Sequence, residues 1–530
     1  MHNDLSFTTI GHLCKWAAQT YGTMPALEEG RTYSFIELDE LRQQAARALI
    51  ALGVKKGDRV MVWGPNTWHW VVAALGLVSI GAILIPASTR FKASEMDDLI
   101  ERSGTPLLFS AGQFLGKYYP QELADKTRSG LNQLVIMGEA QDERDCGWQA
   151  FLEKGNSISA QQLHDVEQSV GPDDLCDMLF TSGTTGFPKG VMFGHKQCLM
   201  GVDGWADRVG LTKGDRVLVI PPFFHAFGYR CGVLVCLLRG ATLIPHLTYQ
   251  PDEILSRIET SGISVIPGPP AIFQGMLQEE NLGQYNLSTL RVGVTGGAVI
   301  PPALIRDMRQ ILGFKDVVSG YGLTECGGFG TMCSADDDDE TIATTAGRPQ
   351  PGLEVAIKDT SGSILPAETT GEVVIRGYAV MQGYFNNEEA TQEIIDEQGY
   401  LHTGDLGQLD KDGNLKIKGR LKDMYICGGF NCYPAEIERL LSSNPAIGSA
   451  AVIGIADDRL GEVGCAFVVL KPGHQLSAEE VISWARDHMA NFKCPRRVEI
   501  VKTLPLSAQS KVRKQDLYEL LNNRAEALVE

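Results

Sequence analysis

The sequence predicts an α/β protein with a large N-terminal domain of two stacked α/β layers and a small β subdomain, followed by a small α+β C-terminal domain. Three observations support this prediction. The chain has 530 residues, which is too long for one hydrophobic core and implies several domains. Strand-like and helix-like segments alternate up to about residue 300, as in parallel sheets covered by helices. From residue 352 onward, short strand-like segments follow one another instead.

The first α/β layer is predicted from three consecutive segments. Residues 37–52 (ELDELRQQAARALIAL) carry apolar side chains with helical periodicity, and Gly53 ends that helix. Residues 58–63 form a short buried strand, and residues 68–80 form a second helix before the strand-like AILIP segment. This order of strand, helix and strand favours a parallel sheet.

The second layer is predicted between residues 216 and 300. Four strand-like segments (RVLVIPP, ATLIPH, SVIPGPP and RVGVTGG) are separated by helix-like segments, one of which begins at Pro251. The same alternation therefore occurs twice, which suggests two related layers.

Antiparallel strands are predicted after Gly352. The segments LEVAIKD and GEVVIRG read as such strands, and Asp412-Gly413 signals a hairpin. After Arg420 a helix beginning at Pro434 is followed by two strands, a helix and a basic tail. We therefore expect two domains, residues 1–420 and 421–530.

Composition excludes several classes of partner. The formal net charge of −18 argues against a nucleic-acid or anionic-membrane binder, since such partners select a basic face. No apolar run is long enough to span a membrane, and residues 1–20 lack a signal-peptide pattern. The twelve cysteines include no CxxC pair, so we expect reduced thiols in a cytoplasmic protein rather than a metal site. The acidic run at residues 336–340 is interpreted as a solvated loop.

Residues 180–195 (FTSGTTGFPKGVMFGH) combine small, hydroxylated and glycine residues with one lysine. Such a segment can turn successive backbone N–H groups toward an anion, so it predicts a phosphate-binding loop. It is not a Walker A loop, because Pro188 stands where that pattern requires glycine. A flexible linker is the competing interpretation, but the apolar residues on both sides argue against it. The predicted phosphate-binding residues are Thr181, Ser182, Gly183, Thr184, Thr185, Gly186 and Lys189.

The segment TSGTTGFPKG closely resembles the phosphate loop of the adenylate-forming superfamily, which comprises acyl-CoA ligases, peptide-synthetase adenylation domains and luciferases. Further segments match motifs of that family in the same order: GGA at residues 296–298, YGLTE at 321–325, GEVVIRG at 371–377, YLHTGD at 400–405 and GRLKD at 419–423. The resemblance covers most of the chain.

The resemblance implies an ATP site. Glu325 would ligate Mg²⁺, a cation that prefers carboxylate and phosphate oxygens, and Thr324 would donate to the α-phosphate. Asp405 would accept the ribose hydroxyls, with Arg420 as a second ribose contact. Without the motifs, Glu325 would read as a surface residue and Asp405 and Arg420 as a surface ion pair. The remaining residues on the nucleotide side are Gly297, Ala298, Gly320, Tyr321 and Gly322.

The C-terminal residues implied by the resemblance act on both half-reactions. Lys511 would enter the cleft as a catalytic residue and contact the α-phosphate, although it could also belong to a solvated basic tail. Ser510 precedes it where the family usually has glycine. Lys422 would be the hinge on which a mobile C-terminal domain rotates. Coenzyme A would pass close to the backbone at two glycines, Gly428 and Gly429, although Phe430 replaces the usual glutamate.

The acid is expected to bind near residues 222–230 (PFFHAFGYR). His225 would act beside the substrate carboxylate, although a lone histidine in an apolar run is often a core residue. Phe224 and Tyr229 suggest an apolar acyl group, and Arg230 either meets a distal oxygen of the substrate or extends to solvent. Residues 223–232 contain no carboxylate to pair a substrate amine, which argues against an amino acid.

The predicted function is an ATP-dependent acid:CoA ligase that releases AMP and pyrophosphate. PFFHAFGYR together with STRFK (residues 88–92) is similar to bacterial ligases of the indane-propionate remnant of the steroid C and D rings. Medium-to-long-chain fatty acids are the second choice of substrate.

Two competing functions use the same scaffold. One is a ligase that forms the acyl-adenylate but loads a carrier protein instead of coenzyme A. The second is a non-enzymatic nucleotide-binding regulator, which predicts loss of Lys511 or Glu325, and both residues are present. The resemblance leaves both a monomer and a homodimer open.

Overall fold

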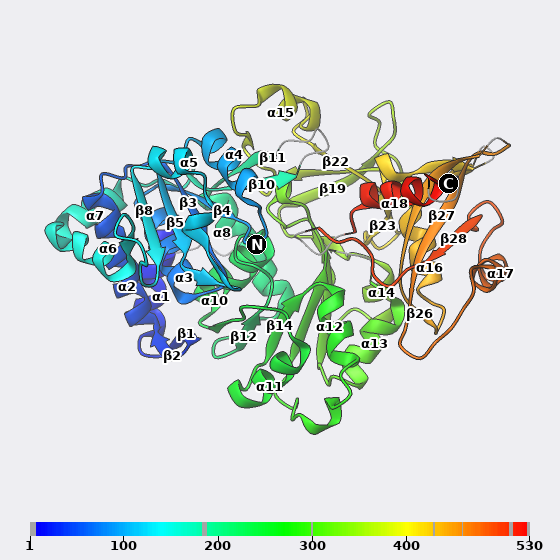
Figure 1. Ribbon diagram of the computed structural model, residues 1–530, viewed down its shortest axis with the longest axis horizontal. Helices are drawn as coiled ribbons and strands as arrows, with labels where there is room; N and C mark the ends of the chain where they lie inside the picture. The colour runs from blue at the N-terminus through cyan, green and yellow to red at the C-terminus, as the bar shows by residue number, and fades with distance from the viewer. Residues whose placement is uncertain are drawn as a thin grey trace.

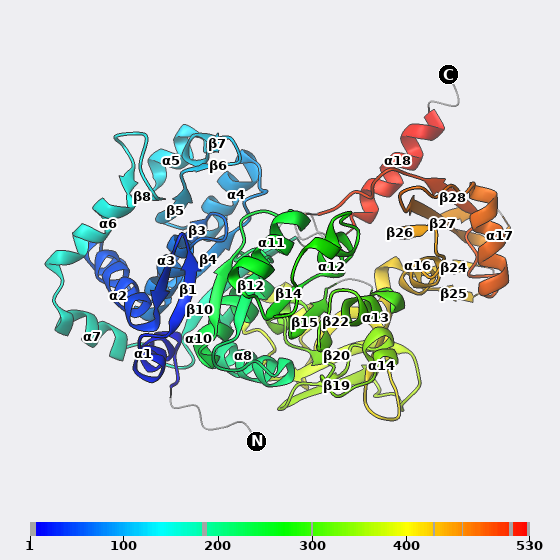
Figure 2. The ribbon, with the colours of Figure 1, turned by 90° about the horizontal axis from the view of Figure 1, so that it is seen from below.

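The computed structural model describes residues 7–182, 188–297, 300–427, 430–457, 459–507 and 512–526. The chain is organised as mixed α/β structure, with a large N-terminal domain and a small C-terminal domain (Figure 1). The C-terminal strands and helix α17 (Ala478–His488) lie at the opposite end of the molecule from the first α/β layer, as two perpendicular views show (Figures 1 and 2).

The first layer contains a sheet whose described strands run in the order β21-β11-β10-β4-β3-β5-β8-β9. The pairings from β10 to β9 along this order are parallel, whereas β11 is antiparallel to both of its neighbours. The strands are β3 (Arg59–Trp63), β4 (Ile83–Ala87), β5 (Leu107–Ala111), β8 (Gln133–Met137), β9 (Cys146–Gly147), β10 (Leu175–Ser182), β11 (Pro188–Gly194) and β21 (Gly383–Tyr384).

The second layer contains a sheet in the order β18-β17-β16-β15-β14-β12-β13-β1-β2 among the described residues. Its central strands, from β16 to β1, are parallel, and the edge strands are antiparallel. The strands are β1 (Pro25–Glu29), β2 (Arg31–Ser34), β12 (Arg216–Val219), β13 (Thr242–Pro245), β14 (Val265–Gly268), β15 (Val292–Gly296), β16 (Asp316–Tyr321), β17 (Thr331–Met332) and β18 (Arg348–Pro349).

Helices accompany these sheets, and they include the two predicted in the first layer and the one predicted to begin at Pro251. Helix α2 (Phe35–Ala51) begins with a capping box, in which Ser34 and Glu37 bond each other's backbone N–H groups. Helix α3 (Trp68–Ser79) begins at the Thr67 cap and is buried from Trp70 onward. Further helices of this domain are α1 (Ile10–Tyr21), α4 (Ala93–Ser103), α5 (Asp125–Gly130), α6 (Trp148–Lys154), α7 (Ala160–Gln168), α8 (His195–Val209), α9 (Ala226–Gly228), α10 (Val235–Arg239), α11 (Pro251–Ser261), α12 (Pro270–Leu277), α13 (Pro302–Gln310), α14 (Asp339–Thr344) and α15 (Glu388–Ile394).

One hydrophobic core joins the two layers. It contains Val62 of β3 and Val219 of β12, both fully buried. The amide of Asn66 adds a polar link, because it donates to the carbonyls of Val219 and Pro221 and accepts from the N–H of Phe223. The two layers are therefore fixed relative to each other.

The small β subdomain is an antiparallel sheet of β19 (Leu353–Lys358), β20 (Gly371–Gly377), β22 (Leu401–Leu409) and β23 (Leu415–Arg420). The predicted hairpin joins β22 and β23. Its turn places Gly413 at a φ of +80°, and the N–H of Asp410 donates to the carbonyl of Asn414 at 3.0 Å.

The C-terminal domain has a sheet of its own, formed by β24 (Tyr425–Cys427), β25 (Phe430–Cys432), β26 (Ile447–Asp457), β27 (Gly461–Leu470) and β28 (Arg497–Ile500). Helices α16 (Pro434–Leu441), α17 and α18 (Lys514–Glu526) accompany it. Ile437, Val468 and Val481 are buried in a separate core. The predicted fold class is confirmed.

One local prediction needs correction. The acidic run is only partly a solvated loop, because Asp338 caps α14 by accepting from the N–H of Thr341 at 2.7 Å. The helix thus uses acidic residues at its N-terminus, where negative charge is favourable. The twelve cysteines all lie in the described part of the chain and are free thiols. No helix among the described residues has the length and apolarity needed to cross a membrane.

Candidate functional site

A cleft of about 2620 Å³ extends between the large and the small domain. Thr181, Thr324 and Asp405 line it from the large domain, and Pro434 and Arg513 line it from the small domain. The guanidinium of Arg90 donates to the backbone carbonyl of Ser507 at 3.3 Å, so the two domains are also in direct contact. Most of the motif residues that the structure describes line this cleft.

Strands β10 and β11 bring Thr181 and Lys189 to the cleft as directly opposed residues. The Lys189 ammonium lies 4.9 Å from the centre of the Tyr384 ring. The backbone of Ser182 ends β10, and Gly183, Thr184, Thr185 and Gly186 fall outside the described residues. The loop that joins the strands is therefore a prediction from the sequence, and the hairpin fixes only its two ends.

Thr324 and Glu325 lie on a single helical turn, η5 (Thr324–Cys326), directly after β16. The Tyr384 hydroxyl donates to Oε1 of Glu325 at 2.9 Å. Burial and the Glu325 charge raise the pKa of Tyr384, so this hydroxyl keeps its proton at neutral pH. Within the described chain no hydrogen bond reaches Oε2 of Glu325. The Lys189 ammonium lies near the ring of Tyr384, the residue that bonds Oε1. A carboxylate with one uncommitted oxygen fits a magnesium ion bound to phosphate.

At Gly296 and Gly320 the cleft is lined by the backbone rather than by side chains. These two glycines are paired between parallel strands β15 and β16, and a Cβ on Gly296 would lie 2.6 Å from the carbonyl oxygen of Gly320. Gly297 follows with a φ of +76°, which favours glycine. Gly297, Gly320, Tyr321 and Gly322 line the cleft, whereas Ala298 lies outside the described residues.

Tyr321, Asp405 and Arg420 form a chain of contacts. The Tyr321 hydroxyl donates to Oδ2 of Asp405 at 2.5 Å, and Nε of Arg420 lies 3.2 Å from Oδ1. Asp405 and Arg420 are cross-strand partners in β22 and β23, so the sheet register brings them together. Asp405 is buried and Arg420 is exposed, and both line the cleft.

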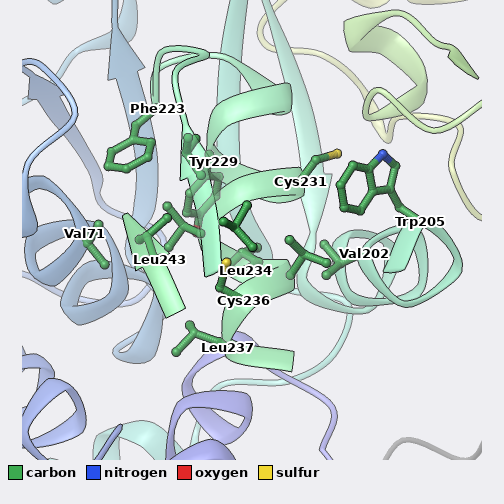
Figure 3. Packing of buried hydrophobic residues seen from close by; sticks show 14 of the residues in the cluster. Val71, Val202, Trp205, Phe223, Tyr229, Cys231, Leu234, Cys236, Leu237 and Leu243 are labelled. Atoms are coloured by element: carbon green, nitrogen blue, oxygen red, sulfur yellow. The ribbon is translucent and has the colours of Figure 1, made fainter. Parts of the chain in front are cut away.

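Apolar residues form another part of the cleft wall. Phe224 and His225 are half-buried, and Nδ1 of His225 accepts from the N–H of Phe227 at 3.2 Å. The sequence did not single out Trp205 of α8 or Cys231, which also line the cleft. Figure 3 shows the Cys231 sulfur directed toward the Trp205 indole. Neither residue carries a local signal, since each lies in an ordinary helical or apolar pattern.

Tyr229 and Arg230 do not line the cleft, unlike the sequence-based expectation. Tyr229 is fully buried and packs on Trp70, with 5.6 Å between the ring centres. Arg230 is fully buried as well, and its Nη2 lies 2.5 Å from Oδ1 of Asp177. The arginine is therefore held by a core carboxylate in place of a substrate oxygen or solvent.

The C-terminal predictions fall largely outside the described residues, namely Gly428, Gly429 and Lys511. Lys422 is described, lies in the short helix η6 (Leu421–Asp423) and lines the cleft. Lys514, which belongs to the basic tail predicted from the sequence, contacts Asp423 at 3.5 Å and Glu438 at 3.1 Å. It thereby ties α18 to the segment that joins the domains.

Comparison with known proteins gives consistent matches. Residues 14–385 match the model of the AMP-binding enzyme family, and residues 436–511 match the AMP-binding enzyme C-terminal domain. A Mycobacterium tuberculosis protein named as a 3-(7a-methyl-1,5-dioxo-octahydro-1H-inden-4-yl)propanoyl:CoA ligase is 46% identical over 98% of this chain and 100% of its own length. A Rhodococcus jostii protein of the same name is 41% identical over 97% of this chain and 98% of its own length.

Comparison with solved structures points to the same family. The anthranilate CoA ligase AuaEII in complex with anthranoyl-AMP superimposes with a TM-score of 0.88, at 26% identity and 98% coverage of both chains. The chain belongs to the family of AMP-binding enzymes.

Proposed function

We propose that this protein is an AMP-forming acyl-CoA ligase. A carboxylate attacks the α-phosphorus of ATP, which gives an acyl-adenylate and releases pyrophosphate. The thiol of coenzyme A then attacks the acyl carbon, forms the thioester and releases AMP. The observation that carries the proposal is the presence in one cleft of Lys189, Thr324, Glu325 and the Asp405–Arg420 pair.

Each of these groups has a role that matches its chemistry. Lys189 and the N–H groups of the predicted loop neutralise phosphate charge. Glu325 would hold Mg²⁺, which would supply positive charge to offset the negative charge of the phosphates. Asp405 accepts ribose hydroxyls with the lone pairs that Tyr321 and Arg420 leave open. His225 orients the acid rather than acting as a base, because a carboxylate is already ionised at neutral pH.

The proposed movement involves the C-terminal domain. Strand β23 ends at Arg420 and the next sheet begins at Tyr425, which supports a boundary between residues 420 and 421. Lys422 then acts as the hinge, Lys511 enters the cleft for adenylate formation, and Gly428 and Gly429 border the path of the coenzyme A arm. A cytoplasmic location is part of the proposal, and the choice between monomer and homodimer can be tested by light scattering.

We propose a bulky alicyclic propionate as the substrate, of the indane-propionate kind derived from steroid C and D rings. The names of the two bacterial relatives and the apolar side chains of Phe224, Trp205 and Cys231 in the cleft support this choice. A medium-chain fatty acid is the second candidate. It is supported by a Danio rerio protein named medium-chain acyl-CoA ligase ACSF2, mitochondrial, which is 32% identical over 98% of this chain and 89% of its own length.

The test is a panel of carboxylates assayed for thioester, AMP and pyrophosphate in the presence of ATP, Mg²⁺ and coenzyme A. We expect the bicyclic propionate to give the highest kcat/KM, followed by straight-chain acids of similar volume. Acyl-AMP formation without any coenzyme A product would instead favour a carrier-loading enzyme. Absence of both products with every acid would contradict the proposal.

A further inference from the structure

Asp177 and Arg230 form an ion pair in the interior of the large domain. Nη2 of Arg230 lies 2.5 Å from Oδ1 of Asp177, its Nε lies 3.3 Å from Oδ2, and neither side chain is exposed. Such a pair is expensive to bury and often adds less stability than apolar side chains of similar volume. Its presence therefore calls for an explanation other than stability. The neighbouring thiols of Cys176 and Cys198 do not make a cation site, because Arg230 already neutralises the only carboxylate of that cluster.

The pair holds both strands that flank the predicted phosphate loop. Asp177 belongs to β10, which leads into the loop, and Phe193 belongs to β11, which leads out of it. The Arg230 guanidinium lies 4.1 Å from the centre of the Phe193 ring. A planar cation that bonds a carboxylate and packs on an aromatic ring has little freedom to move.

Arg230 also belongs to the segment that carries Phe224 and Cys231, which together with Trp205 form the part of the cleft proposed to contact the acyl group, called the acyl wall below. It lies in the π-helical turn η3 (Tyr229–Leu234), which follows the cleft residues His225 and Phe227 and contains Cys231. A π-helical turn inside a helix is uncommon and is frequently found at functional sites. Anchoring Arg230 therefore sets where this wall stands relative to the phosphate loop.

A third contact reaches the turn that carries Glu325. A Cβ on Gly327 would lie 2.7 Å from Nη1 of Arg230, so the guanidinium occupies the place of a side chain there. Gly327 has a φ of +68° and ends the turn η5. In the described part of the chain Nη1 has no hydrogen-bond partner, so packing rather than bonding defines this approach.

We propose that Asp177 and Arg230 are a positioning pair that fixes the phosphate-loop strands, the acyl wall and the Glu325 turn relative to one another for adenylate formation. This inference rests on the proposed function. Neither residue touches the substrate, so the pair acts through Lys189, His225 and Glu325. Capture of the acyl-adenylate by coenzyme A depends much less on this alignment, since pyrophosphate has left and the bond to be formed lies at the acyl carbon.

The experiment measures the two half-reactions separately in the full-length protein. The double variant Asp177→Leu/Arg230→Met replaces the pair by apolar side chains and should keep a melting temperature near that of the wild type. We expect carboxylate-dependent ATP–pyrophosphate exchange to fall at least tenfold with a raised KM for MgATP. Thioester formation from supplied acyl-AMP should stay within about twofold of the wild type.

A conservative variant provides a second measurement that does not depend on the double variant folding. Arg230→Lys keeps the charge but loses the forked hydrogen bonds and the planar face, so exchange should fall about threefold to tenfold. Arg42→Lys is the matched control, because Arg42 is equally buried and bonds Glu167 in a region that does not line the cleft. Arg42→Lys should lower the melting temperature without changing the ratio of the rates of the two half-reactions.

Two outcomes overturn the inference. Either the double variant or Arg230→Lys performs both half-reactions at wild-type rates, or the two rates fall by the same factor, as in a purely structural role. A wild-type protein with no carboxylate-dependent exchange would instead contradict the proposed function, so the two failures are distinguishable.

Discussion

The Tyr321 hydroxyl donates a 2.5 Å hydrogen bond to Oδ2 of Asp405, at the point where the second α/β layer meets the small β subdomain. Arg420 contacts the second carboxylate oxygen, Oδ1, at 3.2 Å. A carboxylate has about four lone-pair positions, so these two contacts leave Asp405 able to accept two further hydrogen bonds. Asp405 is therefore held by two contacts and keeps lone pairs for the ribose hydroxyls that the proposed function assigns to it.

Replacing Asp405 with asparagine tests this assignment. Asp405→Asn should raise the KM for ATP about tenfold or more, because a hydrogen bond to a charged group contributes about 1.5–3 kcal/mol and 1.4 kcal/mol is a factor of ten. The KM for the carboxylic acid should change little. Asp412→Asn, at the exposed tip of the same hairpin, is the control. Equal KM values for ATP in both variants would show that Asp405 does not bind the nucleotide.

The Tyr384–Glu325 hydrogen bond gives a graded prediction about Mg²⁺. Glu325→Gln should reduce adenylate formation by more than about a hundredfold, since the charged ligand is lost. Tyr384→Phe should raise the Mg²⁺ concentration needed for half-maximal rate about threefold to tenfold, the effect of a hydrogen bond worth about 1 kcal/mol. Tyr400→Phe is the control, because that hydroxyl bonds Glu354 away from the cleft. Unchanged Mg²⁺ dependence in Tyr384→Phe would refute the role of this hydrogen bond.

Cys231 and Cys236 provide a test position and a matched control for the contribution of the cleft wall to substrate selection. Both are buried, but only Cys231 lines the cleft, opposite Trp205 (Figure 3). Cys231→Leu should lower kcat/KM for the bicyclic propionate at least tenfold and affect slender straight-chain acids less, because the added methyl groups occupy acyl space. Cys236→Leu should leave the ratio of the two kcat/KM values unchanged. The same ratio in both variants would remove Cys231 from the acyl wall.

Much of the fold could be predicted because its signals are local. Ser34 and Glu37 form a capping box over three residues, and Asp412-Gly413 lies in a short hairpin connection. Gly297 and Thr324 come just after the parallel strands β15 and β16, so the order of that sheet brings them to the same cleft. Neither inference requires knowledge of distant contacts.

The rest depends on contacts between distant segments. Arg230 in an apolar run reads either as a substrate contact or as a residue that extends to solvent, until Asp177, 53 positions earlier in the chain, is seen to pair with it. Trp205 and Cys231 reach the cleft only through the packing of α8 against the π-helical turn, which leaves no trace in local periodicity. The cap on α14 was missed because an acidic run carries the same pattern whether it is solvated or begins a helix.

The stability of the protein should decrease as pH falls below about 6.5. Burial lowers the pKa of His195 to about 4, while its Nδ1 accepts from the N–H of Ile10 at 3.2 Å. Between pH 6.5 and 4 the unfolded chain binds a proton at this histidine that the folded chain does not, which favours unfolding. The full effect is about 3 kcal/mol, since one pKa unit corresponds to about 1.4 kcal/mol.

Thermal unfolding at several pH values checks this prediction. His195→Asn keeps an acceptor for the Ile10 N–H and does not titrate in this range. Its melting temperature should therefore decrease less between pH 7 and 5 than that of the wild type. Parallel curves for the two proteins would show that His195 is not the titrating group.

The central claim is that the carboxylic acid is activated as an ester of AMP, and oxygen transfer tests it most directly. The protein is supplied with the bicyclic propionate labelled with ¹⁸O in its carboxyl group, together with ATP, Mg²⁺ and coenzyme A, and the products are analysed by mass spectrometry. We predict one ¹⁸O atom in the phosphate of AMP, because the carboxylate oxygen that attacked the α-phosphorus leaves with it. Unlabelled AMP accompanying the thioester, or the formation of ADP with labelled inorganic phosphate, would contradict the account.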